Sequence, residues 1–249
     1  MIRTLAIIQA RMTSTRLPGK VIAPLAGAPL LAHVIRRALA APGVEAAVVA
    51  IPEGDAHEPI ERLVAPMPDV ALVRGPEHDV LARFRLAIDR WQPEVVVRIT
   101  ADCPLIDPAV IGAVVALRQA TGAAYACTAP ESGYPLGYDV EVVTAEALRL
   151  AHRLARDPYE REHVTPFVWR RADLFPCVHL DRRPDRRHWR LCVDAPEDLG
   201  VAAAIFERLY PLDPLFGYEP VARLLEAEPW ILEHNAHVRQ HPLVWSTAS

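Results

Sequence analysis

Short apolar runs alternate with amphipathic segments along the first 130 residues of the chain. A continuous apolar run is typical of a buried strand, and apolar residues recurring every three to four positions are typical of a helix with one buried face. The pattern predicts strands at Thr4–Ile8, Ala46–Ile51, Asp69–Val73, Glu94–Thr100 and Ala123–Cys127, and helices at Pro29–Ala41, Asp79–Trp91 and Pro108–Ala120. Because strands and helices alternate, we expect an α/β fold with a mostly parallel sheet and helices on both faces.

The pattern loosens after Thr128, where residues 129–138 form a loop rich in Pro, Gly and Ser. The later pattern predicts strands at Asp139–Val143 (antiparallel or at an edge) and His188–Val193, and helices at Thr144–Arg156, Pro158–Arg171 and Pro196–Tyr210. We expect one α/β domain over residues 1–210, followed by a C-terminal helical extension over residues 211–249.

Composition and charge exclude several classes of protein. Hydrophobic residues make up 51% of the 249 residues, which is typical of a globular chain. The net charge of −4 argues against nucleic-acid binding. No apolar run approaches the roughly 20 residues of a membrane span, and the apolar start is too short for a signal peptide. We therefore expect a cytoplasmic protein with no membrane association.

Lysine occurs once among the 27 basic residues, at Lys20, and all the others are arginine. Arginine presents a planar fork, whereas lysine presents a compact point charge. A site that needs the smaller cation would explain the exception, and chance in an arginine-rich chain is the alternative.

The segment that directly follows the first predicted strand has the chemistry of a phosphate site. It carries three cations and three hydroxyls: Arg11, Arg16, Lys20, Thr13, Ser14 and Thr15. Ligands of open α/β sheets bind beyond the carboxyl ends of the strands, and such side chains suit a polyphosphate. Neither the dinucleotide fingerprint nor the P-loop pattern is present. A solvated basic loop is the alternative.

Two aspartates stand at the ends of predicted strands. Asp102 follows Glu94–Thr100, and Asp194 ends His188–Val193. If both strands lie beside the first, both carboxylates face the basic loop and, with triphosphate oxygens, could hold Mg²⁺. The alternatives are a turn carboxylate before Pro104 for Asp102 and a helix cap for Asp194.

Six ordered motifs give the whole chain a resemblance to a known family. They are Ile8–Lys20, Arg74–Arg83, Arg98–Asp107, Gly137–Glu141, Arg161–Pro166 and Val193–Leu199. The chain resembles the cytidylyltransferases that activate acidic sugars, in the branch of spore-coat polysaccharide biosynthesis protein F-like proteins, and is similar to CMP-Kdo synthetases. The resemblance implies a nucleotide-diphospho-sugar-transferase-like, Rossmann-type sheet, with a nucleotide half over about residues 1–128 and an acceptor half over about residues 129–200.

The resemblance also implies an activity, which is Mg²⁺-dependent transfer of CMP from CTP to an acidic sugar or related acid, with release of pyrophosphate, for surface glycan biosynthesis. Expected partners are CTP, a small acidic acceptor and a second copy of the chain in a homodimer. Expected catalytic residues are Arg11, Arg16 and Lys20, and expected metal ligands are Asp102 and Asp194. Expected nucleotide contacts are Ala10, Arg11, Ser14, Arg16, Lys20, Arg74, Asp79 and Asp102. For Arg74 and Asp79, an ion pair and a helix cap are equal alternatives.

Four residues of the second half are candidate acceptor contacts: Asp139, Glu141, Arg161 and His163. Asp139 and Glu141 alternate along one strand face, so both can point into one cleft. Arg161 suits an acidic acceptor, and His163 is a candidate titrating group near pH 7. A structural ion-pair network among these four residues is the alternative. The competing functions are a glycosyltransferase that uses a nucleotide sugar, a nucleotidyltransferase for another base, and a non-enzymatic binding module.

Overall fold

The structure, a computed structural model, describes residues 2–128 and 132–239. Its main sheet has the strand order β5-β4-β1-β6-β8-β7-β9. The strands are β1 (Thr4–Gln9), β4 (Ala46–Pro52), β5 (Val70–Gly75), β6 (Val95–Thr100), β7 (Tyr125–Cys127), β8 (Glu141–Thr144) and β9 (Cys177–His179). Among the described residues, β8 is the only strand of this main sheet that runs antiparallel to both of its neighbours. The predicted mostly parallel α/β sheet is confirmed, and the strand predicted at 139–143 is antiparallel but internal.

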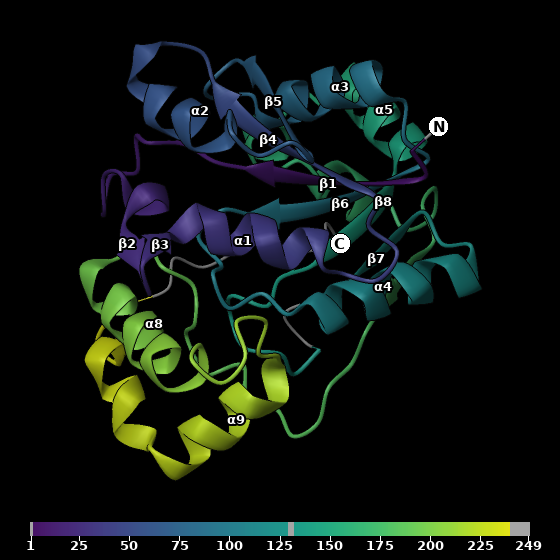
Figure 1. Cartoon of the computed structure of the whole chain (residues 1–249). Helices are drawn as coiled ribbons and strands as arrows, with labels where there is room; N and C mark the ends of the chain where they lie inside the picture. Colours follow the sequence, from purple (N-terminus) through teal and green to yellow (C-terminus); the bar gives the residue numbers. More distant parts are fainter. Residues whose placement is uncertain (1, 129–131, 240–249) are drawn as a thin grey trace.

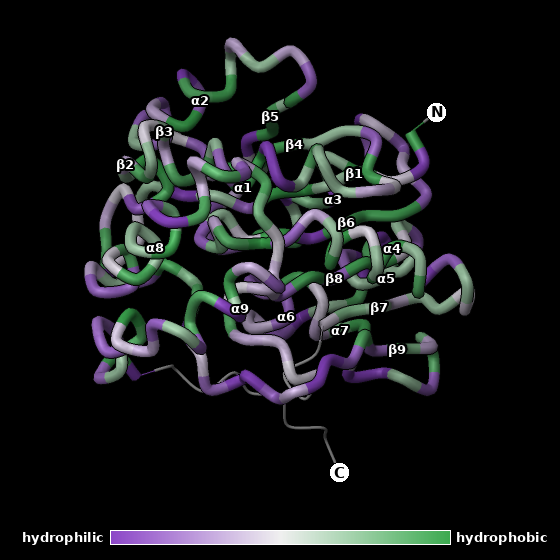
Figure 2. Tube along the Cα trace, turned by 60° about the horizontal axis from the view of Figure 1, so that its bottom comes forward, coloured by the Kyte–Doolittle hydropathy of each residue, from purple (hydrophilic) through white to green (hydrophobic). Residues whose placement is uncertain are grey.

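Helices cover both faces of the sheet (Figure 1). They are α1 (Leu30–Leu39), α2 (Glu58–Val64), α3 (Val80–Trp91), α4 (Pro108–Thr121), α5 (Ala145–Leu154), α6 (Pro158–His163), α7 (Pro166–Trp169), α8 (Pro196–Leu209) and α9 (Tyr218–Ala227). Successive residues of β1 enter different cores, because strand side chains alternate between faces. Ile8 packs with α1, α4 and α8, whereas Ile7 packs with α3 and α5. The apolar strands between these layers are visible in Figure 2.

Two predicted elements differ from the structure. His188–Val193 forms no strand of the sheet and makes a single bridge, between Leu136 and Arg190. The backbone approaches closely there, because a Cβ on Gly137 would lie 2.6 Å from the carbonyl carbon of Leu191. The helix predicted at Pro158–Arg171 divides into α6 and α7. Val164 between them has a φ of 72°, and Pro166, at the first position of α7, has no N–H with which to continue α6.

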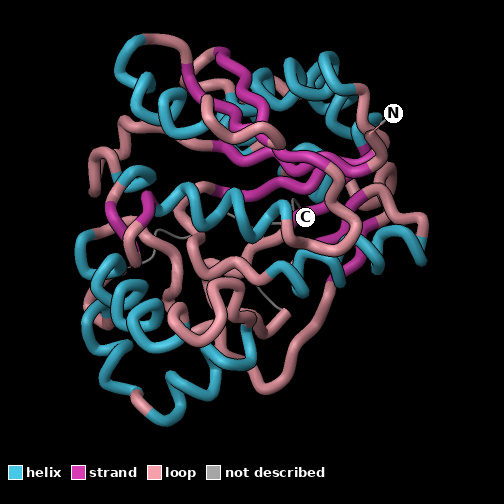
Figure 3. Tube along the Cα trace, viewed as in Figure 1, coloured by secondary structure: helices cyan, strands magenta, loops and turns pink. Residues whose placement is uncertain are grey.

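Several short elements carry no clear apolar pattern and were not predicted. They are α2, β9, the two-stranded ribbon of β2 (Pro24–Leu25) and β3 (Ala28–Pro29), and the 3₁₀ turns Lys20–Ile22 and Asp55–His57. The ribbon of β2 and β3 can be followed in Figure 3 at the place where Figure 1 labels these strands.

The chain after α8 folds back onto the domain. α9 and the 3₁₀ helix Pro229–Asn235 lie beside α8, and the rings of Phe206 and Phe216 meet edge to face at 5.2 Å. Arg37, fully buried on α1, donates to the carbonyl of Phe216 at 2.8 Å. The described part of the C-terminal extension therefore shares the core of the α/β unit. Within the described chain, no helix combines the length and apolar character needed to cross a membrane.

Candidate functional site

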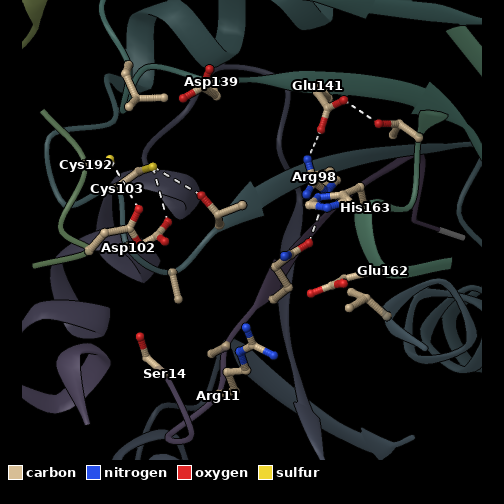
Figure 4. Close-up of a pocket in the computed structure, with 18 of the residues that line it drawn as sticks. Arg11, Ser14, Arg98, Asp102, Cys103, Asp139, Glu141, Glu162, His163 and Cys192 are labelled. Carbon is tan, nitrogen blue, oxygen red and sulfur yellow. Dashed lines mark hydrogen bonds and ion pairs between the residues drawn. The ribbon is translucent and has the colours of Figure 1, made fainter. Parts of the chain in front are cut away.

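A cavity of about 350 Å³ lies where β1 and β6 end side by side. The strand order reverses at this point, because β4 lies on one side of β1 and β6 lies on the other. Open α/β sheets bind ligands at such a reversal. Its lining includes these predicted site residues: Ala10, Arg11, Ser14, Arg16, Lys20, Asp102, Asp139, Glu141, His163 and Asp194. Figure 4 shows Asp102 with Cys103 and Cys192 on one side, and Arg98, Glu141 and His163 on another. The structure therefore brings the basic loop and the carboxylates together.

Lys20 lies between the two aspartates. Its ammonium Nζ is 2.7 Å from Oδ2 of Asp102 and 2.6 Å from Oδ1 of Asp194. Burial alone would lower the pKa of Lys20, but the two carboxylates outweigh it and raise that pKa to about 12. Burial would likewise raise the pKa of Asp102, yet Lys20 and hydrogen bonds hold it at about 2. This charge pairing explains why a compact cation suits position 20.

The contacts around Asp194 show whether its carboxylate caps α8 or faces the cations of the cavity. The carboxylate of Asp198 accepts from the amide of Ala195 at 2.9 Å, so Asp198 caps α8. Asp194 instead directs its carboxylate at cations, since Arg16 donates to Oδ2 at 2.8 Å. The side chain of Asp194 therefore does not cap α8, and the capping alternative is wrong.

The donor set of Asp102 and Asp194 fits a divalent cation. The two carboxylates already hold a positive charge between them, the ammonium of Lys20, and carboxylate oxygens are the ligands that hard cations prefer. No group of three or more potential metal-ligating side chains occurs among the described residues. Phosphate oxygens and water would therefore have to complete the coordination, which is common for Mg²⁺.

Glu141 belongs to a closed network at the other end of the cavity. Its carboxylate forms an ion pair with Arg98 and accepts from the hydroxyls of Tyr125 and Thr165. Arg98 also donates to the side-chain oxygen of Gln9 at 3.0 Å. This network is structural, but Glu141 pairs in it with Arg98 and with none of the other three candidate acceptor contacts, so the ion-pair network expected among those four residues is not the one observed.

Asp139 and His163 keep more of their polar surface available to the cavity. Oδ2 of Asp139 accepts from the amide of Gly137 at 2.9 Å. Burial raises the pKa of Asp139 to about 6, with the charges of Glu141 and Asp102 adding to the effect. Burial, followed by the charge of Arg98, lowers the pKa of His163. This shift favours the neutral form of the His163 imidazole.

Three predicted binding residues lie outside the lining of this cavity. Asp79 caps α3, accepting from the amide of Ala82 at 2.9 Å, and forms an ion pair with Arg161. Arg74 pairs with Glu61 and donates to the carbonyl of Gly54 at 3.1 Å. The cap expected for Asp79 is present, but its ion-pair partner is Arg161 rather than Arg74. The geometry gives these three side chains structural contacts and no place in the cavity.

Several contributing residues were missed from the sequence. Arg83 and Arg98 line the cavity, and Arg190, Asp198 and Asn235 support Asp194 from behind. Arg83 is 2% exposed, and its Nε has no hydrogen-bond partner among the described residues. One signal was available for Asn235, because it is the only asparagine in the chain.

Comparison with known proteins identifies the family of the chain. The model of the cytidylyltransferase family matches residues 5–231. The chain is 31% identical over 212 residues to the spore coat polysaccharide biosynthesis protein SpsF of Bacillus subtilis, covering 82% of this chain and 86% of the relative. It is 33% identical over 201 residues to the 3-deoxy-manno-octulosonate cytidylyltransferase of Rhodopseudomonas palustris, covering 73% of this chain and 79% of the relative.

A solved structure of a cytidylyltransferase from Leptospira borgpetersenii superimposes with a TM-score of 0.88 at 26% identity. The match covers 98% of this chain and 100% of that chain. The match to the family model spans nearly the whole described fold, including both metal-ligand candidates and the basic loop. The resemblance seen in the sequence motifs is thus confirmed, and this chain belongs to the cytidylyltransferase family.

Proposed function

We propose that the protein transfers CMP from CTP to a small acidic acceptor, a sugar acid or related acid of surface glycan biosynthesis, with release of pyrophosphate. The observation that carries the proposal is the position of Lys20 between Asp102 and Asp194, in a cavity also lined by Arg11 and Arg16. The names of the relatives, a cytidylyltransferase for a sugar acid and a polysaccharide biosynthesis protein, support the nucleotide and the acceptor class.

In the proposed reaction an acceptor oxygen attacks the α-phosphorus of CTP. A new phosphorus–oxygen bond forms, and the bond to the pyrophosphate leaving group breaks. Such transfers depend on positioning and on neutralising charge more than on covalent catalysis by the protein. Arg11 makes no hydrogen bond or ion pair with the described residues, so its guanidinium is available to the phosphates. Arg16 and Lys20 can exchange their aspartate partners for phosphate oxygens as the nucleotide enters.

Asp102 and Asp194 would hold the Mg²⁺ expected for this reaction. When bound, the ion would neutralise phosphate charge and orient the reacting oxygens. The two aspartates are poised for this role because their carboxylates share one buried cation, the ammonium of Lys20.

We place the acceptor beside Asp139 and His163, at the end of the cavity away from the basic loop. Asp139 and the neutral imidazole of His163 offer polar atoms to hydroxyl groups. Arg161 is engaged with Asp79, so the acidic group of the acceptor would be met by Arg11 and the bound cation instead. The homodimer stays a prediction.

The test is pyrophosphate release with Mg²⁺, each of the four nucleoside triphosphates and a panel of sugar acids. We expect release with CTP only, dependent on the acceptor, and a loss of roughly 10²–10³-fold in kcat for Asp102→Asn. The control is Arg62→Met, which removes one exposed surface charge. No release with any nucleotide, together with tight binding of an intact nucleotide sugar, would favour a glycosyltransferase instead.

A further inference from the structure

Asp194 stands on a segment that the sheet does not hold in place. Residues 188–193 make a single bridge, to Leu136, and the amide of Val193 donates to the carbonyl of Asp102, but neither contact holds the side chain of Asp194, so a further support must fix its carboxylate. That support is the carboxylate of Asp198, which is 1% exposed. It accepts from the amides of Asp194 and Ala195, both at 2.9 Å.

Arg190 joins this support to Asp194 itself. Its Nε donates to Oδ1 of Asp198 at 2.8 Å, and its NH2 group donates to Oδ2 at 2.9 Å. The same NH2 group lies 3.3 Å from Oδ2 of Asp194. Burial would lower the pKa of Arg190, but its bonds to Asp198 raise it, so the guanidinium stays charged. Asp198 and Arg190 thus hold both the backbone and the carboxylate of Asp194.

Asn235, from the last turn of the 3₁₀ helix Pro229–Asn235, completes the network from the C-terminal extension. Its Nδ2 donates to Oδ1 of Asp198 at 2.8 Å and to the carbonyl of Arg190 at 2.9 Å. An amide nitrogen has two hydrogens, and both are used here. The side chain is 4% exposed, so neither bond can be replaced by bulk water.

The chemistry of this position selects asparagine. Aspartate would set a second carboxylate against Asp198, and alanine would leave the Arg190 carbonyl and one oxygen of Asp198 short of a donor in a buried site. The side chain contacts neither Asp194 nor the cavity directly. Its influence on the cavity therefore passes through Asp198 and Arg190.

We propose that Asn235 is a positioning residue for the cation site: through Asp198 and Arg190 it sets where the carboxylate of Asp194 lies relative to Asp102. This inference rests on the proposed function, because it takes Asp194 to be a ligand of the divalent cation. It makes the C-terminal extension a part of the catalytic unit and gives the single asparagine of the chain a role.

The test compares Asn235→Ala with Glu233→Ala, an exposed change in the same 3₁₀ helix. Mn²⁺ binding is measured by electron paramagnetic resonance with CTP and without acceptor, beside Tm and the steady-state constants. Loss of an outer-shell partner weakens metal binding by about 10–100-fold. We expect a weakening in that range for Asn235→Ala, with a lower kcat and a smaller change in KM for CTP. Asn235→Ser, which can keep one donor, should fall between, and Glu233→Ala should match the wild type.

A lower Tm with Mn²⁺ affinity and kcat at the level of Glu233→Ala would overturn the proposal, since that is the signature of a purely structural residue. A crystal structure of Asn235→Ala gives a readout that needs no activity. We expect the carboxylate of Asp194 to move away from Lys20, and an unmoved carboxylate would also overturn the proposal. If the carboxylate of Asp194 moves in Asn235→Ala but the wild-type protein releases no pyrophosphate, only the proposed function is rejected.

Discussion

The backbone amide of Val193 donates a hydrogen bond of 2.8 Å to the carbonyl of Asp102. This bond joins the turn after β6 to the segment before α8, although the two are far apart in the sequence. It sets Asp102 and Asp194 on neighbouring stretches of backbone, and Lys20 then bridges their side chains. The candidate cation site therefore depends on a backbone hydrogen bond that brings the two aspartates together and on the charge of Lys20 between their carboxylates.

Removal of the charge at position 20 should open this site to metal. Lys20→Met removes the cation that lies between the two carboxylates, although Arg16 still pairs with Asp194. A unit charge about 4 Å away in a partly buried site is worth a few kcal/mol. We expect Mn²⁺ affinity in the absence of nucleotide to rise by at least about tenfold, while kcat falls by roughly 10²–10³-fold. Electron paramagnetic resonance of Mn²⁺ and the pyrophosphate assay measure the two effects separately.

Arg62→Met is the matched control for Lys20→Met, because it removes one positive charge from the exposed surface. It should leave both quantities near the wild-type values. Equal nucleotide-free Mn²⁺ affinity in Lys20→Met and Arg62→Met would show that the ammonium does not compete with the metal.

Local pattern was sufficient to predict most of the α/β framework. The apolar run Leu5–Ile8 is buried, and the stripe of α3 that begins after Asp79 faces the core. These elements are predictable because burial of an apolar face dominates their stability. The placement of the basic loop beyond β1 follows from the same logic, since the loop comes directly after the strand.

The strand predicted at His188–Val193 is wrong because its outcome depends on a residue far away in the sequence. Apolar spacing over so short a segment cannot tell a sheet strand from an extended stretch of chain. Here the segment makes one bridge, between Arg190 and Leu136, and its backbone lies close to Gly137 rather than along a strand of the main sheet.

Neighbours in space decide the contacts of two candidate site residues. Asp194 is a candidate cap of α8 by its position in the sequence, but Asp198 reaches back to Ala195 instead. Arg161 is expected from its charge to meet the acceptor, yet Asp79 lies within its reach and pairs with it. Neither partner can be chosen from the local sequence, since each is set by how the elements pack.

The raised pKa of Asp139 predicts that the stability of the protein depends on pH. Its pKa rises to about 6 in the folded protein because burial disfavours the charged form, whereas the unfolded value is near 3.8. A raised pKa means that the protonated group favours folding at low pH, and that this contribution is lost as the pH rises through about 6. Asp139→Asn should therefore be more stable than the wild type by about 1–2 kcal/mol above pH 7, and nearly equal to it at pH 4.

Chemical denaturation at several pH values measures the difference for Asp139→Asn. The control is Asp69→Asn, at an exposed position. A gain in stability that is the same at pH 4 and pH 8 would contradict the raised pKa, because only a titrating group changes its contribution over that interval.

Substitution of Glu141 tests whether this residue stabilises the fold or contacts the acceptor. Removing one partner of a buried ion pair leaves the other charge uncompensated, at a cost of about 3–5 kcal/mol. We expect Glu141→Ala to lose stability in this range, because Arg98 is left buried and the hydroxyls of Tyr125 and Thr165 lose their acceptor. Glu162→Ala, an exposed change on the same cavity, should stay within about 0.5 kcal/mol of the wild type.

The double variant Arg98→Met with Glu141→Ala sharpens this test. If the pair stabilises the fold, removing both charges should recover part of the stability lost in Glu141→Ala, because no uncompensated charge is left behind. An acceptor contact without a structural role would instead leave the free energy of unfolding unchanged in Glu141→Ala and raise only the KM for the acceptor. Urea denaturation together with acceptor titration separates the two roles.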